Sequence, residues 1–427
     1  MRKYRVKVQL VACASALLGC LAMIPFLANG QGPGERGPRF GDPLRGLGPA
    51  ERARFEAGKD GFEEVEAIAD GIGPVFNDVS CVACHGGSAT GGSSPVISVR
   101  FGRIVNGRFN DMKEFGGPTI QRQGIGPVNG VDFVGEVVPP EATIVSRRRA
   151  NPLFGLGLVD AVPDQTFHDL AAFQWANFPD IAGRPNITRN FRTGLPAVGK
   201  FGWKGQLATI FDFTGDAYKD EMGITTAGFT DPAFPGVVFP FFRSDDDRLL
   251  GEENPPQGNE ALLAANPVGS PNEPDDEDLV GFTDFITFLG PPPRGPITAE
   301  VRRGEAVFRS INCATCHAPS LQTGPNQVRA LNSVRFQPYS DFLLHDMGSL
   351  GDGIGGEGEE GSARGVEMRT APLWGLRTLP FYLHDGRAET VEQAILMHEG
   401  QGRGARNRFA ALPGPARQAL LAFLNSL

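Results

Sequence analysis

Two copies of the pentapeptide Cys-x-x-Cys-His constrain this chain more than any other feature of its sequence. One copy spans residues 81–85 and the other spans residues 313–317. Two thiols one helical turn apart can reach the two vinyl groups of a haem, and the adjacent imidazole can bind the haem iron. The spacing therefore predicts two covalently attached c-type haems. The expected attachment residues are Cys81, Cys84, His85, Cys313, Cys316 and His317.

Zinc and a redox-active dithiol are the rival interpretations of these pentapeptides. Four cysteines and two histidines can bind zinc, and a Cys-x-x-Cys pair can act as in thioredoxin. A zinc site does not require histidine directly after the second cysteine in both copies. A dithiol requires a strand-to-helix context, which residues 78–80 and 310–312 do not clearly provide. The other two of the six cysteines, Cys13 and Cys20, lie near the N-terminus, so we favour two haems and expect no structural disulfide.

Residues 1–30 resemble a secretory signal peptide, with a basic start and an apolar run over residues 8–28. Cleavage after Gly30 is the expected outcome. Two alternatives remain open: an uncleaved membrane anchor, because the apolar run is just long enough to span a bilayer, and a lipid on Cys20, which follows Leu-Leu-Gly. Bacterial c-type haem is attached outside the cytoplasm, so we expect a periplasmic protein. It would meet a membrane only if the segment is kept or lipidated.

Charge argues against one class of partner. The formal net charge is -9, and loss of residues 1–30 removes four basic residues and no acidic ones, which moves it to -13. Such a chain repels the phosphate backbone, so nucleic acid is not an expected partner.

The two halves of the chain contain similar segments in the same order. A helical stretch with Gly and Phe precedes each pentapeptide, residues 151–157 are matched by residues 371–377, and each half ends in an apolar helix, at 279–289 and 418–427. Three prolines at 291–293 separate the halves.

These patterns predict a mostly α fold of two cytochrome c-like haem domains with long ordered loops. The N-terminal haem domain is expected over 31–292, with loop insertions between about residues 86 and 275, and the C-terminal haem domain over 293–427. The count of 57 glycines and 35 prolines supports the long loops.

The sixth ligand of each iron decides whether a haem carries electrons or binds an oxygen species. Besides the two pentapeptide histidines, the chain has only His168, His345, His384 and His398. His398 follows a predicted helix, and the thioether of Met397 beside it is a competing ligand. Each histidine could instead be held by backbone hydrogen bonds, and His168 reads as a helix-surface residue.

Four segments resemble the dihaem oxidoreductase family, which is related to the bacterial dihaem cytochrome c peroxidases. They are residues 76–81, 152–158, 338–348 and 383–388, and the likeness runs from residue 41 to the end of the chain. In the related peroxidases, a methionine twelve residues after a His-Asp-Gly segment ligates the electron-transfer haem. The twelfth residue after Gly386 is His398, so the resemblance implies a bis-histidine C-terminal haem. The expected iron ligands are thus His85, His317 and His398, with His345, His384 and Met397 as weaker candidates.

The resemblance also implies an activity. A small donor protein, such as a cytochrome c or a cupredoxin-like protein, would reduce the C-terminal haem, which would pass electrons to a reactive N-terminal haem that reduces peroxide. Candidate acid or base residues are Glu114, Glu136 and Glu141, and the resemblance does not choose among them. Trp374, Trp203 and Trp175 could relay electrons between the haems, with Trp374 ahead of the other two, although a tryptophan beside a haem more often serves in packing. The alternative is a dihaem electron-transfer cytochrome without peroxidase activity.

Overall fold

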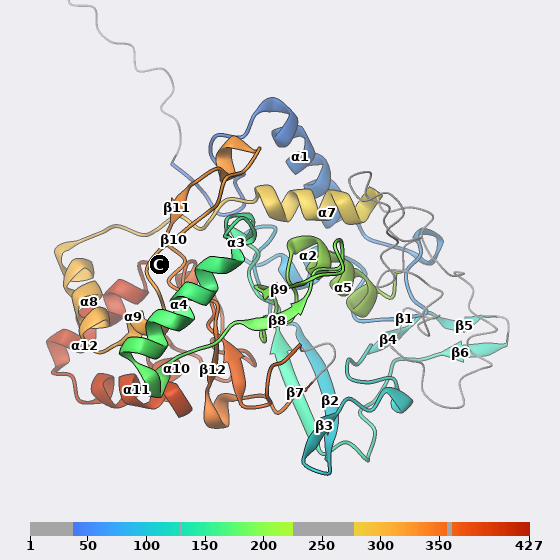
Figure 1. Ribbon diagram of the computed structural model, residues 1–427. Coiled ribbons are helices and arrows are strands. Elements are labelled where there is room, and N and C mark those ends of the chain that lie inside the picture. Colours follow the sequence, from blue (N-terminus) through green and yellow to red (C-terminus); the bar gives the residue numbers. More distant parts are fainter. Residues whose placement is uncertain (1–36, 129, 225–276, 357–360) are drawn as a thin grey trace, which may run out of the picture. The chain divides into compact units, whose positions relative to one another are not determined.

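The computed structural model describes residues 37–128, 130–224, 277–356 and 361–427 (Figure 1). The predicted export segment lies outside these residues. The described α-helices are α1 (Pro49–Glu63), α2 (Cys81–His85), α3 (Leu156–Asp160), α4 (Asp164–Asn177), α5 (Ile210–Met222), α7 (Glu277–Phe288), α8 (Ala299–Ser310), α9 (Cys313–Cys316), α10 (Val391–Leu396), α11 (Arg403–Ala410) and α12 (Gly414–Leu424). No helix in this described part of the chain is long and apolar enough to cross a membrane.

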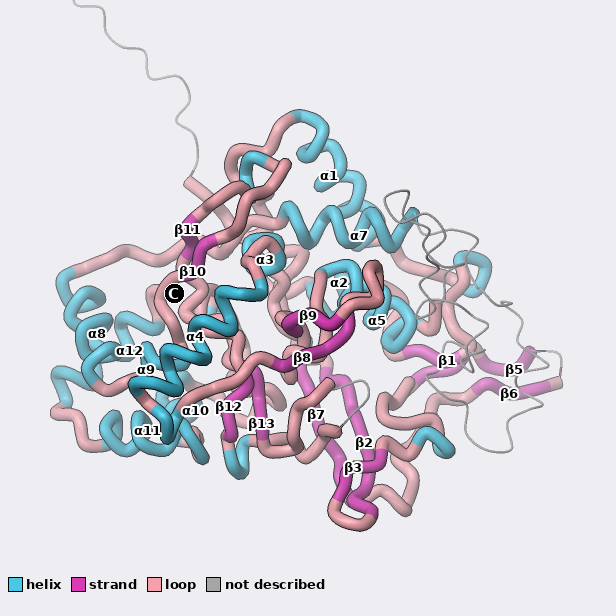
Figure 2. The backbone as a smooth tube through the Cα atoms, viewed as in Figure 1, coloured by secondary structure: helices cyan, strands magenta, loops and turns pink. Residues whose placement is uncertain are grey.

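Short strands punctuate the chain between the helices, as Figure 2 shows. They are β1 (Val75–Phe76), β2 (Ile97–Val105), β3 (Arg108–Asn110), β4 (Gln123–Gly124), β5 (Gly126–Val128), β6 (Val131–Phe133), β7 (Ile144–Arg149), β8 (Asn186–Arg189), β9 (Pro196–Gly199), β10 (Leu321–Gln322), β11 (Arg335–Phe336), β12 (Leu344–Asp346) and β13 (Glu367–Arg369).

The prediction of a mostly α fold is wrong. Within the described residues the strands pair into six small sheets, five with two strands and one with the order β3-β2-β7. The longest pairing joins β2 to β7 in antiparallel register, from Ile97 opposite Arg149 to Gly102 opposite Ile144. These strands were missed because most are two to four residues long, too short to show an alternating pattern. Strands β2 and β7 are also distant from each other in sequence, so no hairpin turn marks their pairing.

The repeated plan of the sequence corresponds to a repeated helix crossing. Helix α1 packs on α7, and α8 packs on α12. A Cβ atom on Gly58 of α1 would lie 2.0 Å from the Gly281 carbonyl oxygen, and one on Gly304 of α8 would lie 1.9 Å from that of Ala419. Only glycine permits such close approach of two helix backbones. The glycine before each pentapeptide therefore fixes where the last helix of its half crosses.

Each crossing also carries an aromatic contact to the pentapeptide histidine. The ring of Phe62 lies 6.2 Å from that of His85, and the ring of Phe308 lies 6.3 Å from that of His317. The matched segments 151–157 and 371–377 likewise adopt the same turn, with Gly155 at φ 74° and Gly375 at φ 73°. The internal repeat is therefore structural as well as sequential.

One hydrophobic cluster contains buried residues from both sides of the proline segment. Phe55, Leu153 and Phe285 precede it, and Leu331 and Trp374 follow it. A second cluster, which includes Phe308, Tyr339 and Phe423, lies wholly on the C-terminal side. The domain boundary at residue 292 remains a prediction, because a shared core does not by itself define where a folding unit ends.

Candidate functional site

Each pentapeptide opens on a cavity. The C-terminal cavity has a volume of about 510 Å³ and is lined by Cys313, Cys316 and His317 together with His398, which follows α10. The N-terminal cavity has a volume of about 160 Å³ and is lined by Cys81, Cys84 and His85 together with residues of α5. The fold thus places both thiols and the imidazole of each pentapeptide on the wall of one cavity.

The backbone fixes the tautomer of three histidines. The Nδ1 atom of His85 lies 3.2 Å from the Gly92 carbonyl oxygen, that of His317 lies 3.1 Å from Tyr339 O, and that of His398 lies 2.8 Å from Ala394 O. A carbonyl oxygen can only accept, so each Nδ1 carries the hydrogen and each Nε2 keeps its lone pair. Histidines that bind metals are usually held in this way.

Burial also keeps these rings neutral. It lowers the pKa of both His85 and His317 to about 4, and it lowers the pKa of His398. An imidazole must be neutral to bind iron. The three ligands predicted from the sequence therefore share the geometry and the protonation state that coordination needs.

The weaker candidates are placed differently. His345 lines the C-terminal cavity, but its Nε2 lies 3.0 Å from Asp341 Oδ2 and its Nδ1 lies 3.6 Å from Cys316 Sγ, so both nitrogens are engaged. His384 lines the same cavity, with its ring 6.2 Å from that of Trp203. Met397 is not among the residues that line either cavity, whereas Met347 lines the C-terminal one. The predicted surface residue His168 is exposed on α4.

Acidic side chains distinguish the N-terminal cavity. Asp216, Asp220 and Glu221 all line it from α5. The Glu221 carboxylate accepts a hydrogen bond of 2.7 Å from Asn77 Nδ2, and burial, reinforced by the negative charge of Asp220, raises its pKa. Among the described residues on the cavity wall, His85 is the only histidine and Met222 the only methionine. This cavity is therefore lined by carboxyl groups, whereas the other is lined by further imidazoles.

The structure does not bring the three predicted acids to either cavity. Glu114 pairs with Arg103 at 2.6 Å, Glu136 accepts a hydrogen bond from the backbone of Gln121, and Glu141 is exposed. They remain predictions without support from geometry. Sequence reasoning missed Glu221, because this residue lies 136 positions beyond His85 and belongs to no local motif other than helix α5, which ends at Met222.

Trp203 lies in the wall between the cavities, because it lines both of them. Its Nε1 donates a hydrogen bond of 2.9 Å to the Arg149 carbonyl oxygen, and the Arg149 guanidinium lies over its ring at 5.2 Å. Trp374, the favoured relay of the sequence analysis, lines neither cavity and packs 5.8 Å from Phe336 in the core. Trp175 is 71% exposed.

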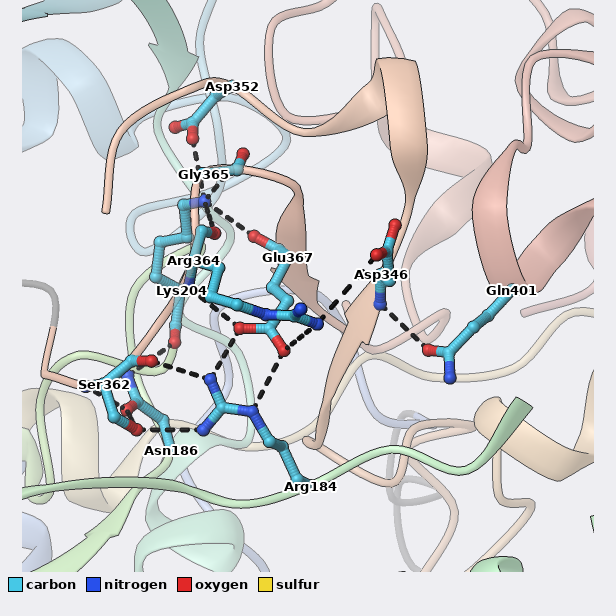
Figure 3. A network of polar contacts seen from close by, with 10 residues as sticks. All are labelled: Arg184, Asn186, Lys204, Asp346, Asp352, Ser362, Arg364, Gly365, Glu367 and Gln401. Carbon is cyan, nitrogen blue, oxygen red and sulfur yellow. Dashed lines mark hydrogen bonds and ion pairs between the residues drawn. The ribbon is translucent and has the colours of Figure 1, made fainter. Parts of the chain in front are cut away.

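A buried ion network is formed around Lys204, the residue that follows Trp203 in the chain. The Lys204 side chain is 0% exposed, and its Nζ lies 2.8 Å from Asp352 Oδ1. It also donates to the carbonyl oxygens of Arg364 and Glu367, as Figure 3 shows. Arg148 pairs with the other Asp352 oxygen at 2.7 Å. Burial alone would raise the pKa of Asp352, but these two cations hold it well below its usual range.

Comparison with known proteins identifies the class. A model of the family described as "Di-haem oxidoreductase, putative peroxidase" matches residues 140–427. This match covers more than half of the chain, so the protein belongs to that family, whose members carry two haem groups. The donor sets in the two cavities fit that cofactor, since each brings together two thiols and an oriented imidazole.

Solved structures give only distant likenesses. The dihaem peroxidase BthA from Burkholderia thailandensis is 15% identical with a TM-score of 0.38, covering 89% of this chain and 86% of that one. Hydrazine synthase from Kuenenia stuttgartiensis is 20% identical with a TM-score of 0.26, covering 40% of this chain and 60% of that one. A MauG-like protein associated with microbial copper homeostasis is 16% identical with a TM-score of 0.25, covering 47% and 71%. No curated protein matches the sequence.

Proposed function

We propose that both haems are attached through thioethers and that the two irons are ligated differently. His317 and His398 would hold the iron of a haem in the C-terminal cavity, and His85 would be the single histidine ligand of a haem in the N-terminal cavity. The support is the shared geometry of these rings, each with Nδ1 held by a carbonyl oxygen. Two strong ligands suit an electron carrier, whereas an open position suits a reactive centre.

The N-terminal cavity is the proposed site of peroxide reduction. A haem bound there supplies the electrons and the open iron position that cleavage of an O–O bond requires. The observation that carries this proposal is Glu221, a half-buried side chain whose carboxyl pKa is raised and which lines the same cavity as His85. Such a group can take a proton from one peroxide oxygen and deliver it to the other. The Asn77 amide holds the carboxylate in place for that task.

Trp203 is the proposed electron relay between the cavities. It replaces Trp374 in this role because only Trp203, of the three tryptophans, lines both cavities. The donor would deliver electrons at the C-terminal cavity, and a small cytochrome c or cupredoxin-like protein fits that task.

Met222 favours a second candidate function. It lines the N-terminal cavity, and a thioether is a possible iron ligand. With that position closed, both haems would be carriers and the protein would be an electron-transfer cytochrome. Against this stands the burial of Met222 in the apolar cluster that includes Tyr218 and Phe282.

Export to the periplasm is part of the same proposal. The basic start and apolar run of residues 1–30 support it, and so does haem attachment outside the cytoplasm. The intact mass of the protein from the periplasm should equal the chain cleaved after Gly30 plus two haems. A mass without haem, or free thiols at the pentapeptides, would refute covalent attachment.

The decisive experiment compares the ferric protein before and after addition of hydrogen peroxide. We expect absorption and electron paramagnetic resonance spectra to show one low-spin and one high-spin haem, with the high-spin signal consumed by peroxide. Two low-spin haems that do not react with peroxide would overturn the peroxidase proposal. In that case Met222→Leu should convert the N-terminal haem to high spin, which would establish the carrier.

A further inference from the structure

Two arginines stand out among the residues that line the C-terminal cavity. Arg149, at the end of β7, is 7% exposed, and Arg369, at the end of β13, is 6% exposed. Both belong to the wall of that cavity. Two buried arginine side chains thus line one cavity.

Neither guanidinium forms an ion pair with a carboxylate among the described residues. The charge of Asp341 acts on Arg369, but Asp341 Oδ2 is already bound by His345 and Gln174. The Arg149 side chain donates to the carbonyl oxygens of Leu383 and Ala150 and to Ser93 Oγ. The Arg369 side chain donates to the carbonyl oxygens of Gly202 and Thr370. In the described part of the chain, Nη2 of neither residue meets an acceptor. By contrast, Arg406, which lines the same cavity, is paired with Glu399.

A buried charge without a counter-ion is costly, so proteins rarely keep two of them side by side. Both groups contact the same stretch of chain, since Arg149 lies over the Trp203 ring and Arg369 donates from Nε to Gly202 O and from its backbone N–H to Trp203 O. Burial lowers the pKa of each to about 10, which still leaves both protonated at neutral pH. This wall of the cavity therefore carries two positive charges.

We infer that Arg149 and Arg369 form the binding site for the two propionate groups of the C-terminal haem. This inference rests on the proposed binding of haem in that cavity. The propionates are the only anionic groups of a haem, and they lie on the porphyrin edge opposite the vinyl groups that the cysteines would bind. Guanidinium groups suit carboxylates, because they present paired N–H donors in a plane.

The assignment has a consequence for the reduction potential. Ferric haem carries one more positive charge than ferrous haem, and unpaired propionates stabilise the ferric form. The arginines cancel those negative charges and so raise the potential. This opposes the lowering expected of bis-histidine ligation in place of histidine and methionine.

The test measures the reduction potential and haem content of Arg149→Met and Arg369→Met in the complete holoprotein. Each change should lower the potential of the low-spin haem and raise its ratio of ferric to ferrous form about tenfold at a fixed applied potential, which is 59 mV for a one-electron couple. Arg149→Lys and Arg369→Lys keep the charge and should recover most of the shift. The matched control is Arg377→Met, since Arg377 also donates to backbone carbonyl oxygens but lines neither cavity.

Unchanged potentials in the haem-loaded methionine variants would overturn the inference. If those variants take up no haem, the lysine variants decide: haem-loaded lysine variants with a near-native potential support the charge role, and lysine variants without haem refute it. The peroxide reaction is recorded in parallel. Its failure in the native protein would sink the proposed peroxidase without moving these potentials, so the two outcomes are separable.

Discussion

The two cavities begin from the same pentapeptide and the same helix crossing, and they differ in what faces the pentapeptide. The C-terminal cavity is lined by His398, Arg149 and Arg369. The N-terminal cavity instead presents Asp216, Asp220 and Glu221 from α5. The same pentapeptide therefore occurs beside two different sets of lining residues, and under the proposed function those residues determine the ligand field and the supply of protons.

Removal of the His398 imidazole should have the largest effect on the difference between the two cavities. His398→Ala should convert the C-terminal haem from low spin to high spin, because one of its two strong ligands is lost. The measurement is the ferric absorption and electron paramagnetic resonance spectrum. His398→Met should keep the low-spin state and raise the potential, and the surface change His168→Ala is the control. An unchanged low-spin spectrum in His398→Ala would contradict the ligand assignment.

Substitution of Glu221 tests the proposed role of the N-terminal cavity in peroxide reduction. Glu221→Gln should lower the rate of peroxide reduction by roughly 10²–10⁴-fold, the usual contribution of a positioned acid or base. The ferric spectra should not change, since the side chain is not a proposed ligand. Glu114→Gln is the matched control, because Glu114 pairs with Arg103 away from both cavities. Equal losses in the two variants would remove Glu221 from the mechanism.

The contribution of the buried ion network beside Trp203 to stability can be measured by substitution. Asp352→Asn leaves Lys204 and Arg148 buried without their shared carboxylate, so it should lower the free energy of unfolding by about 3–5 kcal/mol. Lys59→Gln breaks an exposed pair and should cost less than about 1 kcal/mol. Chemical denaturation of the haem-loaded proteins measures both, and equal costs would show that the network adds no stability.

The same network should make stability depend on pH in one direction. The folded-state pKa of Asp352 lies below that of the unfolded chain. The contribution of the ionised Asp352 carboxylate to the free energy of unfolding is therefore fully present at neutral pH. It is lost as the pH falls below about 4, the ordinary pKa of aspartate. Asp352→Asn should flatten this part of the pH profile.

The smallest expected effect concerns Trp203, the proposed electron relay between the two cavities. Trp203→Phe keeps an aromatic ring but removes the indole hydrogen bond to Arg149 O. It should slow oxidation of the low-spin haem after peroxide addition, as followed by stopped-flow absorption, without altering either resting spectrum. Trp374→Phe and Trp175→Phe should leave that rate unchanged. An equal decrease of this oxidation rate in Trp374→Phe would instead favour Trp374, the relay candidate preferred in the sequence analysis.

Sequence patterns located much of the local structure. Apolar helices were expected at 279–289 and 418–427, and the structure has helices at Glu277–Phe288 and Gly414–Leu424. The glycines before the pentapeptides and the match between segments 151–157 and 371–377 were also recognisable in the sequence, and the structure shows that the two segments adopt the same turn. The strands were not, because pairs such as β2 and β7 are stabilised by partners distant in sequence rather than by a local pattern.

By itself, the sequence determined the two attachment motifs, the histidines available as ligands and the placement of His398 relative to the His-Asp-Gly segment. Each of these depends on spacing along the chain. The tertiary structure decided that Glu221 rather than Glu114, Glu136 or Glu141 lines the cavity of His85, that Trp203 rather than Trp374 lines both cavities, and that Arg149 and Arg369 line the same cavity. These residues meet only after chain folding brings β7, β13 and α5 together, and no periodicity in the sequence records a contact of that kind.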